Sequence, residues 1–168
     1  MTPALYSASV PVFQHYLDRL EGLVGRVQGQ EAMLGARLAP DMFTAGQQIA
    51  SAVGFTLRIS YLLAGLEPPR DSDLGVDRIG LLRRIQVARE GLAGLDPATF
   101  AGADTRRIRH RAGFAELDQT AAVFLHLFGM PNFMFHTCMA FAVLRGQGLE
   151  IGKADFDGLH DYPHGFRF

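Results

Sequence analysis

The stretch from Gln119 to Leu144 contains no Asp, Glu, Lys or Arg, and it limits the possible folds more than any other part of the sequence. A charge-free segment of this length could cross a lipid bilayer as a helix. Against this, Gly129 and Pro131 interrupt the segment, and His126 and His136 would place polar rings in hydrocarbon, where they are costly. We therefore expect two helical pieces, divided at residues 129–132 and buried inside a protein that does not span a membrane.

Elsewhere, apolar residues recur at helical spacing in segments that Gly, Pro and Asp separate. The predicted helices cover residues 9–27, 31–38, 41–63, 78–92, 119–128 and 131–145. Asp41 is a good N-cap for the third of these, which is almost uncharged and therefore expected to be central. Long helices with short or moderate connections predict an all-α fold, an up-and-down four-helix bundle with short extra helices.

Between the predicted helices 78–92 and 131–145, residues 106–117 predict a small β-hairpin. Alternation along a strand would place Arg107, Arg109 and Arg111 on one face. That face could bind phosphate, or it could be a solvated surface whose charges Glu116 and Asp118 balance. The chain reads as a single domain over residues 1–168, with an extended C-terminal tail from about residue 151.

Charge and cysteine content exclude several classes of function. The chain has 16 Lys and Arg against 17 Asp and Glu, so it has no strong positive field and we expect no nucleic-acid partner. Its single cysteine, Cys138, excludes an internal disulfide. The first twenty residues lack the pattern of a signal peptide, so we expect a cytoplasmic protein without a membrane partner.

The polar residues on the apolar helices are the candidates for chemistry. Asn132 and His136 are four residues apart, so their side chains should lie on the same helix face. In the central helix, Gln47 and Gln48 interrupt an apolar surface, and Gln48 shares a face with Phe55. Gln48 is thus expected to face the core, although a rotation by one position would present Gln47 instead.

Two interpretations of Gln48, Asn132 and His136 follow from their chemistry. They could form a satisfied buried hydrogen-bond network, with Asn132 bonded to local backbone. They could instead bind a small molecule in the bundle core, or a divalent metal such as Zn or Ni centred on His136. An imidazole is a good zinc ligand and a carboxamide a poor one, so the cofactor remains unknown at this point.

Two segments resemble a known family. The segments are Leu38-Ala39-Pro40-Asp41-Met42-Phe43, with Gln48 after it, and Leu127-Phe128-Gly129-Met130-Pro131-Asn132-Phe133-Met134-Phe135-His136, continued by Val143-Leu144-Arg145-Gly146-Gln147-Gly148 and Gly152-Lys153-Ala154-Asp155-Phe156. They are similar to an uncharacterised DinB-like domain-of-unknown-function family, and the opening Leu5-Tyr6-Ser7-Ala8-Ser9-Val10-Pro11-Val12-Phe13 is similar as well. This family belongs to the DinB/YfiT-like superfamily of bacterial four-helix bundles, many of them homodimers and regarded as metalloenzymes.

The resemblance implies a ligand set that this chain keeps only in part. Superfamily members typically bind a divalent metal with one His from the second helix and two His four apart in the last. His136 matches the last of these ligands, whereas Asn132 and Gln48 stand at or near the other two. We therefore expect a homodimeric, non-catalytic binding protein with a degenerate metal site. The alternative is a metal-dependent enzyme, hydrolase or thiol-transferase-like, with a site centred on His136.

Overall fold

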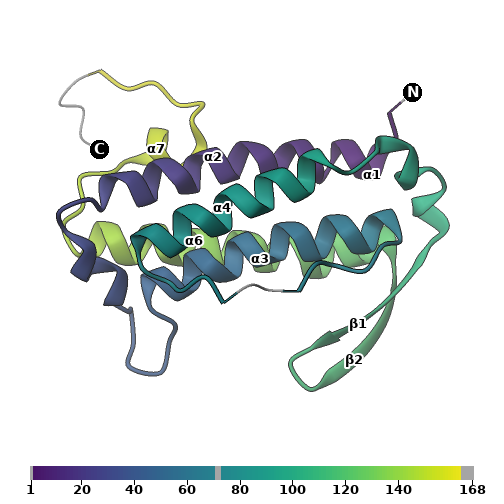
Figure 1. Cartoon of the computed structure of the whole chain (residues 1–168), viewed down its shortest axis with the longest axis horizontal. Coiled ribbons are helices and arrows are strands. Elements are labelled where there is room, and N and C mark those ends of the chain that lie inside the picture. Colours follow the sequence, from purple (N-terminus) through teal and green to yellow (C-terminus); the bar gives the residue numbers. More distant parts are fainter. Residues whose placement is uncertain (1, 71–72, 164–168) are drawn as a thin grey trace.

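Helices make up most of the computed structural model, which describes residues 2–70 and 73–163. The long helices lie side by side (Figure 1): α2 (Val10–Arg26), α3 (Ala45–Ala64), α4 (Arg78–Ala93) and α6 (Met130–Gly146). The shorter elements are α1 (Ala4–Ser7), η1 (Glu31–Gly35), η2 (Pro97–Phe100), η3 (Ala103–Thr105), β1 (Arg107–Ala112), β2 (Ala115–Thr120), α5 (Ala121–Val123), η4 (Phe124–Gly129) and α7 (Lys153–Asp157).

The order of helix directions differs from strict up-and-down alternation, because α3 and α4 run the same way (Figure 1). The connection over residues 65–77 returns along the molecule before α4 begins. With 20 residues, α3 is roughly 30 Å long. The connection can extend roughly 40 Å, so it is long enough to make this return. A connection of this length allows the next helix to run in either direction, so the spacing of the helices in the sequence does not determine the direction of α4.

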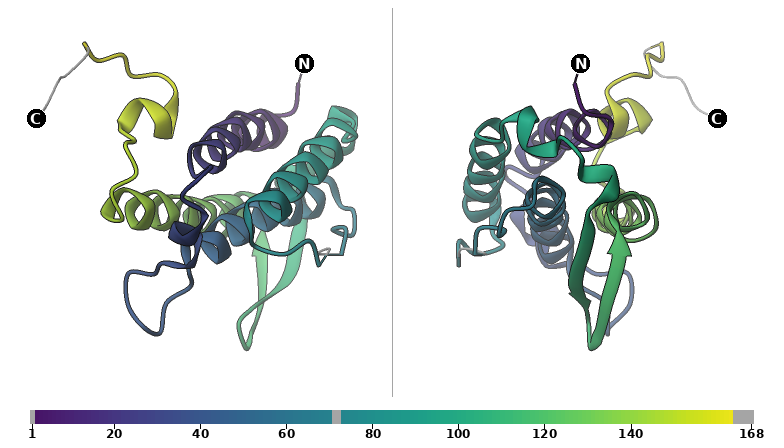
Figure 2. Two further views of the ribbon diagram at one scale, coloured as in Figure 1. Left: turned by 60° about the vertical axis from the view of Figure 1, so that its left-hand side comes forward. Right: turned by 90° about the vertical axis from the view of Figure 1, so that its right-hand side faces the viewer.

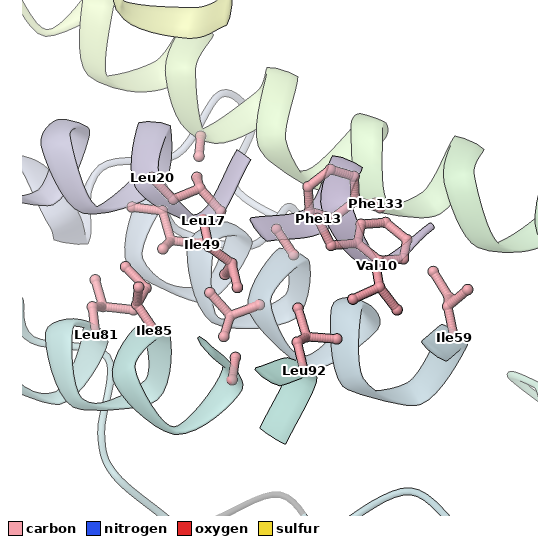
Figure 3. Packing of buried hydrophobic residues seen from close by; sticks show 14 of the residues in the cluster. Val10, Phe13, Leu17, Leu20, Ile49, Ile59, Leu81, Ile85, Leu92 and Phe133 are labelled. Carbon is pink, nitrogen blue, oxygen red and sulfur yellow. The ribbon is translucent and has the colours of Figure 1, made fainter. Parts of the chain in front are cut away.

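The core is formed by apolar stripes from the long helices (Figure 3). The stripe of α2 supplies Phe13 and Leu17, and α6 supplies Phe133, whose ring meets that of Phe13 edge-on at 5.0 Å. Ile49 from α3 and Ile85 from α4 are fully buried against them. These spacings of three and four residues are the ones the sequence predicts for core-facing helices.

The central helix α3 begins at Ala45 rather than at Asp41. Thr44 and Gln47 form a capping box, in which the Thr44 hydroxyl accepts from the Gln47 amide and the Gln47 side chain accepts from the Thr44 amide. These bonds satisfy two backbone N–H groups at the start of α3. Asp41 lies four residues before Ala45, too far away to accept from them. Asp41 lies in a turn instead.

The apolar segment after the hairpin forms one helix, Ala121–Gly146, and is not divided at residues 129–132. Its segment η4 is π-helical and ends at Gly129, two residues before Pro131. A π-helical segment changes the hydrogen-bond pattern where proline lacks an N–H, so the helix continues through it. By length and hydropathy this helix could cross a membrane, but one side of it packs on α3 through buried residues such as Phe133 and Ala140.

The predicted hairpin is present and projects from the helices (Figure 2). In its antiparallel register, Arg109 pairs with Asp118, and the Asp118 carboxylate is 2.9 Å from Nε of Arg107 and 3.3 Å from Nε of Arg109. The alternation holds, because Arg107, Arg109 and Arg111 are exposed while His110 is buried. Asp118 thus belongs to a strand, and Thr120 caps the helix that follows.

The C-terminal segment does not begin as an extended tail. Ile151 is buried, and α7 packs beside α2, where Arg26 and Asp155 form an ion pair of 2.8 Å. The His15 ring also bonds to the Asp157 carbonyl at 2.7 Å. The sequence pattern predicts no helix here, because α7 has only five residues, too few for helical periodicity to register.

Candidate functional site

The two adjacent glutamines of α3 face in different directions. Gln48 is only 2% exposed and points toward α6, while Gln47 is exposed and serves in the capping box. Consecutive helical residues differ by about 100° around the axis, so only one of the two can face the core. The structure thus places Gln48 inward, the orientation that its apolar neighbours indicate.

His136 from α6 meets Gln48 directly. The Nδ1 atom of His136 lies 2.6 Å from Oε1 of Gln48, and because this oxygen is an acceptor, Nδ1 donates. The imidazole also lies near two roughly parallel aromatic rings: the ring centroid of Phe43 is 6.2 Å from that of His136 with planes 17° apart, and that of Phe55 is 5.6 Å away at 26°. The hydrogen bond and the two rings fix both the position and the tautomer of His136.

Burial lowers the pKa of His136 below its ordinary value of 6.5. Partial removal from water disfavours the imidazolium ion, and no carboxylate among the described residues forms an ion pair with it. At neutral pH the ring is therefore uncharged, with a proton on Nδ1 and a lone pair on Nε2. It can accept one hydrogen bond or bind one cation through that lone pair.

Asn132 does not join these two residues. It lies one turn before His136 in α6, but its Nδ2 atom donates to the backbone carbonyl of Phe128 at 2.7 Å. This carbonyl belongs to the π-helical segment, where the backbone hydrogen bonds differ from those of a regular α-helix. The structure thus brings Gln48 and His136 together and leaves Asn132 bonded to its own helix.

A second buried histidine, His110 of β1, was missed by the sequence reasoning. It is 7% exposed, its Nε2 lies 2.9 Å from Oε1 of Gln119, and its Nδ1 is buried without a partner in the described structure. Its ring packs 4.4 Å from Phe128, which in turn lies 5.9 Å from Phe55. The signal was present in the strand alternation, which puts His110 on the face opposite the arginines.

Arg58 of α3 covers the same aromatic row. Its guanidinium carbon lies 5.8 Å from the Phe55 ring centroid and 5.3 Å from that of Phe128, and its Nη2 donates to the backbone carbonyl of Arg111. Desolvation lowers the pKa of Arg58, although the group stays charged. No Asp or Glu among the described residues forms an ion pair with it.

Two cavities of about 650 and 660 Å³ border α3, and neither is lined by Gln48, Asn132 or His136. Among the described residues, no group of three or more His, Cys, Asp and Glu side chains is arranged to hold a metal. One imidazole bonded to a carboxamide does not fit the three-histidine set that the superfamily resemblance implies.

Comparison with known proteins agrees with the overall fold. The family model of a domain of unknown function, DUF1993, matches residues 5–157. The chain belongs to the DUF1993 family. This DUF1993 chain is also similar to the crystal structure of a DinB family member protein from Shewanella denitrificans, with a TM-score of 0.83 and 27% identity over 94% of each chain. A search of curated proteins finds no match. The resemblance to a DinB-like family that the sequence motifs suggested is thereby confirmed.

Proposed function

We propose that this DUF1993 protein is a non-catalytic, dimeric, cytoplasmic binding protein whose DinB-type metal site has degenerated. The observation that carries the proposal is the 2.6 Å hydrogen bond between Gln48 and His136. These side chains come from the helices that carry metal ligands in the superfamily, and here they bind each other. A histidine whose Nδ1 is bonded to a buried carboxamide, with Asn132 turned to its own helix, is a satisfied polar pair.

The dimer part of the proposal is supported by the outer face of the long helix 121–146. Val123, Leu127 and Phe135 follow one another at spacings of four and eight residues, and Leu127 and Phe135 are 74% and 50% exposed. Exposed apolar rows of this kind mark interaction sites in soluble proteins. We propose that the same helix of a second copy covers this row, since a charge-free face has nothing to repel an identical one.

Size-exclusion chromatography with light scattering tests the dimer. Leu127→Glu and Phe135→Glu are expected to give monomers, because they bury a charge in an apolar interface. Leu159→Glu is the matched control: Leu159 is 80% exposed but lies outside this helix, and its variant should remain a dimer. A monomeric wild-type chain at the same concentration contradicts this part of the proposal.

The alternative function, a metal-dependent hydrolase or thiol-transferase-like enzyme, is favoured by one feature of the same pair. Because Nδ1 of His136 donates to Gln48, the lone pair of Nε2 is available, and burial keeps the ring neutral. A metal-binding histidine usually donates its other ring N–H to an oxygen acceptor, and the Gln48 carboxamide oxygen is such an acceptor here. Such a metal would act as a Lewis acid on a bound substrate or water.

Metal analysis of protein purified without chelator or affinity metal distinguishes these functions. We expect less than stoichiometric metal, and no saturable binding of Zn²⁺ or Ni²⁺ that His136→Ala removes. His126→Ala is the control, because His126 is an exposed histidine on the same helix that could bind metal weakly at the surface. One metal per chain, lost in His136→Ala and kept in His126→Ala, would overturn the proposal in favour of the enzyme.

A further inference from the structure

One of the two cavities on α3 lies on a different face from the His136 pair. It has a volume of about 650 Å³ and lies between α3, α4 and the residues Pro68, Pro69, Arg70 and Val76 of the connection. This volume is within the range of small-molecule sites in proteins, which are about 300–1,000 Å³. The cavity shares Phe43 and Phe55 with the aromatic packing around His136, but Gln48 and His136 do not line it.

The walls of the cavity are largely apolar. Val76 from the connection and Val87 from α4 line it, and both side chains are exposed although they are aliphatic. Pro68 and Pro69 form a further part of the wall. A ligand with an apolar body would remove these surfaces from water, which favours binding.

One stripe of α3 gives the cavity its polar end. Ser51, Gly54 and Arg58 are spaced by three and four residues, so they lie along one side of the helix, and all three line the cavity. A Cβ at Gly54 would meet no atom within 4 Å, so the glycine leaves open space on this side of α3, between Ser51 and Arg58 in the stripe. Glycine inside a helix is less favourable than alanine, and packing within this chain does not require a glycine at this position.

The charged side chains among the described lining residues are all cationic. Among the described lining residues are Arg58, Arg70 and Arg84 but no Asp or Glu. Nε of Arg84 donates to the Gly75 carbonyl, so Arg84 is already engaged. Arg58 is half-buried, and its described contacts are the two phenylalanine rings and one backbone carbonyl, none of which neutralises its charge. A partly desolvated cation without a counterion favours an anionic ligand.

We infer that this cavity binds a small organic anion, a carboxylate with an apolar body, whose carboxylate pairs with Arg58 and whose body lies along Gly54 against Val76 and Val87. Guanidinium groups recognise carboxylates with two parallel hydrogen bonds, and Nε and Nη1 of Arg58 form no other bond in the described structure. The inference goes beyond the proposed function, because it concerns a different face of α3 and does not depend on whether His136 binds metal.

Calorimetric titration of the full chain with 4-phenylbutyrate and decanoate tests the inference, with the corresponding primary amides as neutral analogues. We expect one carboxylate per chain to bind, at least about tenfold more tightly than its amide, which corresponds to about 1.4 kcal/mol. Metal content measured on the same sample tests the proposed function separately, so either result can fail without the other. No saturable binding of either carboxylate at millimolar concentration would overturn the inference.

Paired variants locate the site and its charge. Gly54→Leu should fill the cavity and abolish binding of acid and amide alike, whereas Gly22→Leu, at another helical glycine with no atom near its Cβ, should bind as the wild type does. Arg58→Gln should weaken carboxylate binding by about tenfold or more and leave the amide unchanged. Arg83→Gln, which removes an exposed α4 charge outside the cavity, should have no effect.

Three outcomes of this series would contradict the inference. Unchanged binding in Gly54→Leu would place the ligand elsewhere on the protein. If Arg58→Gln weakened binding of the acid and of the amide equally, the ligand would not be selected as an anion. If Arg58→Gln and Arg83→Gln weakened carboxylate binding equally, the effect would come from the net charge of the protein and not from a site at Arg58. Circular dichroism melting of each variant shows that a loss of binding is not a loss of fold.

Discussion

Nδ1 of His136 and Oε1 of Gln48 lie 2.6 Å apart, although 88 positions separate the two residues in the sequence. The bond joins α3 to α6 at a point where both helices are otherwise apolar. It sets the tautomer of the imidazole, with the proton on Nδ1, while partial burial beside the rings of Phe43 and Phe55 lowers the pKa of His136 and favours the neutral form. A single polar pair therefore links helix packing to the protonation state of His136.

The first prediction concerns pH. Burial lowers the pKa of His136 in the folded chain, whereas the unfolded chain has the ordinary value of 6.5, so the unfolded state binds more protons once the pH falls toward 6.5. Stability should therefore be full above about pH 6.5 and should decline as the pH falls through the window below it. Urea denaturation at about pH 7.5 and about pH 5 measures this decline.

The control for this prediction is a comparison of two histidine variants on one helix. His136→Gln should show a smaller loss of stability between the two pH values than the wild type, because the group responsible has been removed. His126→Gln, which changes an exposed histidine, should lose as much as the wild type. An equal decline in His136→Gln and the wild type would mean that other groups cause the acid sensitivity.

The second prediction is that the metal site can be restored. Replacing Gln48 and Asn132 by His in one chain should bring three imidazoles together, because Gln48 already contacts His136 and Asn132 is one helical turn away from it. Equilibrium dialysis should then show one Zn²⁺ per chain, where the wild type is expected to show none. Adding His136→Ala to the double variant should remove the bound metal.

The matching control uses the neighbouring glutamine. Gln47 is exposed on another face of α3, so a chain with Gln47→His and Asn132→His should not bind zinc, although it contains as many added histidines. Zinc binding of equal strength in the two double variants would show that the geometry around Gln48 is not what determines the site.

The sequence predicted part of the site because its signal is local. Apolar neighbours one turn away indicated that Gln48 faces inward, and spacing of four placed Asn132 and His136 on one face. What periodicity cannot show is where a side chain finds its hydrogen-bond partner. Asn132 bonds to the Phe128 carbonyl because a π-helical segment precedes Pro131, and no pattern in the sequence marked that segment.

For the fold, the sequence predicted the long helices and the hairpin, but not the path between them. Twenty apolar-rich residues are enough to identify α3, whereas the connection over residues 65–77 carries no periodic signal and can lead to either end of the bundle. The direction of α4, and with it the cavity beside Gly54, depends on that connection. Tertiary packing decided what local propensity left open.

The third prediction contrasts two helical glycines. A Cβ at Gly54 would meet nothing within 4 Å, so Gly54→Ala should raise the free energy of unfolding by about 0.5–1 kcal/mol through helix propensity. A Cβ at Gly80 would lie 2.0 Å from the Leu74 carbonyl oxygen, so Gly80→Ala should lower it by about 1–3 kcal/mol or more. Thermal and urea unfolding measure both, and the same sign for the two variants would contradict the packing described around α4.

The last prediction separates the expected cap of α3 from the observed one. The Thr44 hydroxyl accepts from the Gln47 amide at 3.2 Å, so Thr44→Ala leaves a helix N–H without its partner and should cost about 1 kcal/mol. Asp41 is exposed in a turn, so Asp41→Ala should change stability by less than about 0.5 kcal/mol. Urea unfolding of the two variants gives the comparison directly. A larger loss for Asp41→Ala would mean that α3 begins earlier, and that Gln48 lies deeper in the helix than its capping box implies.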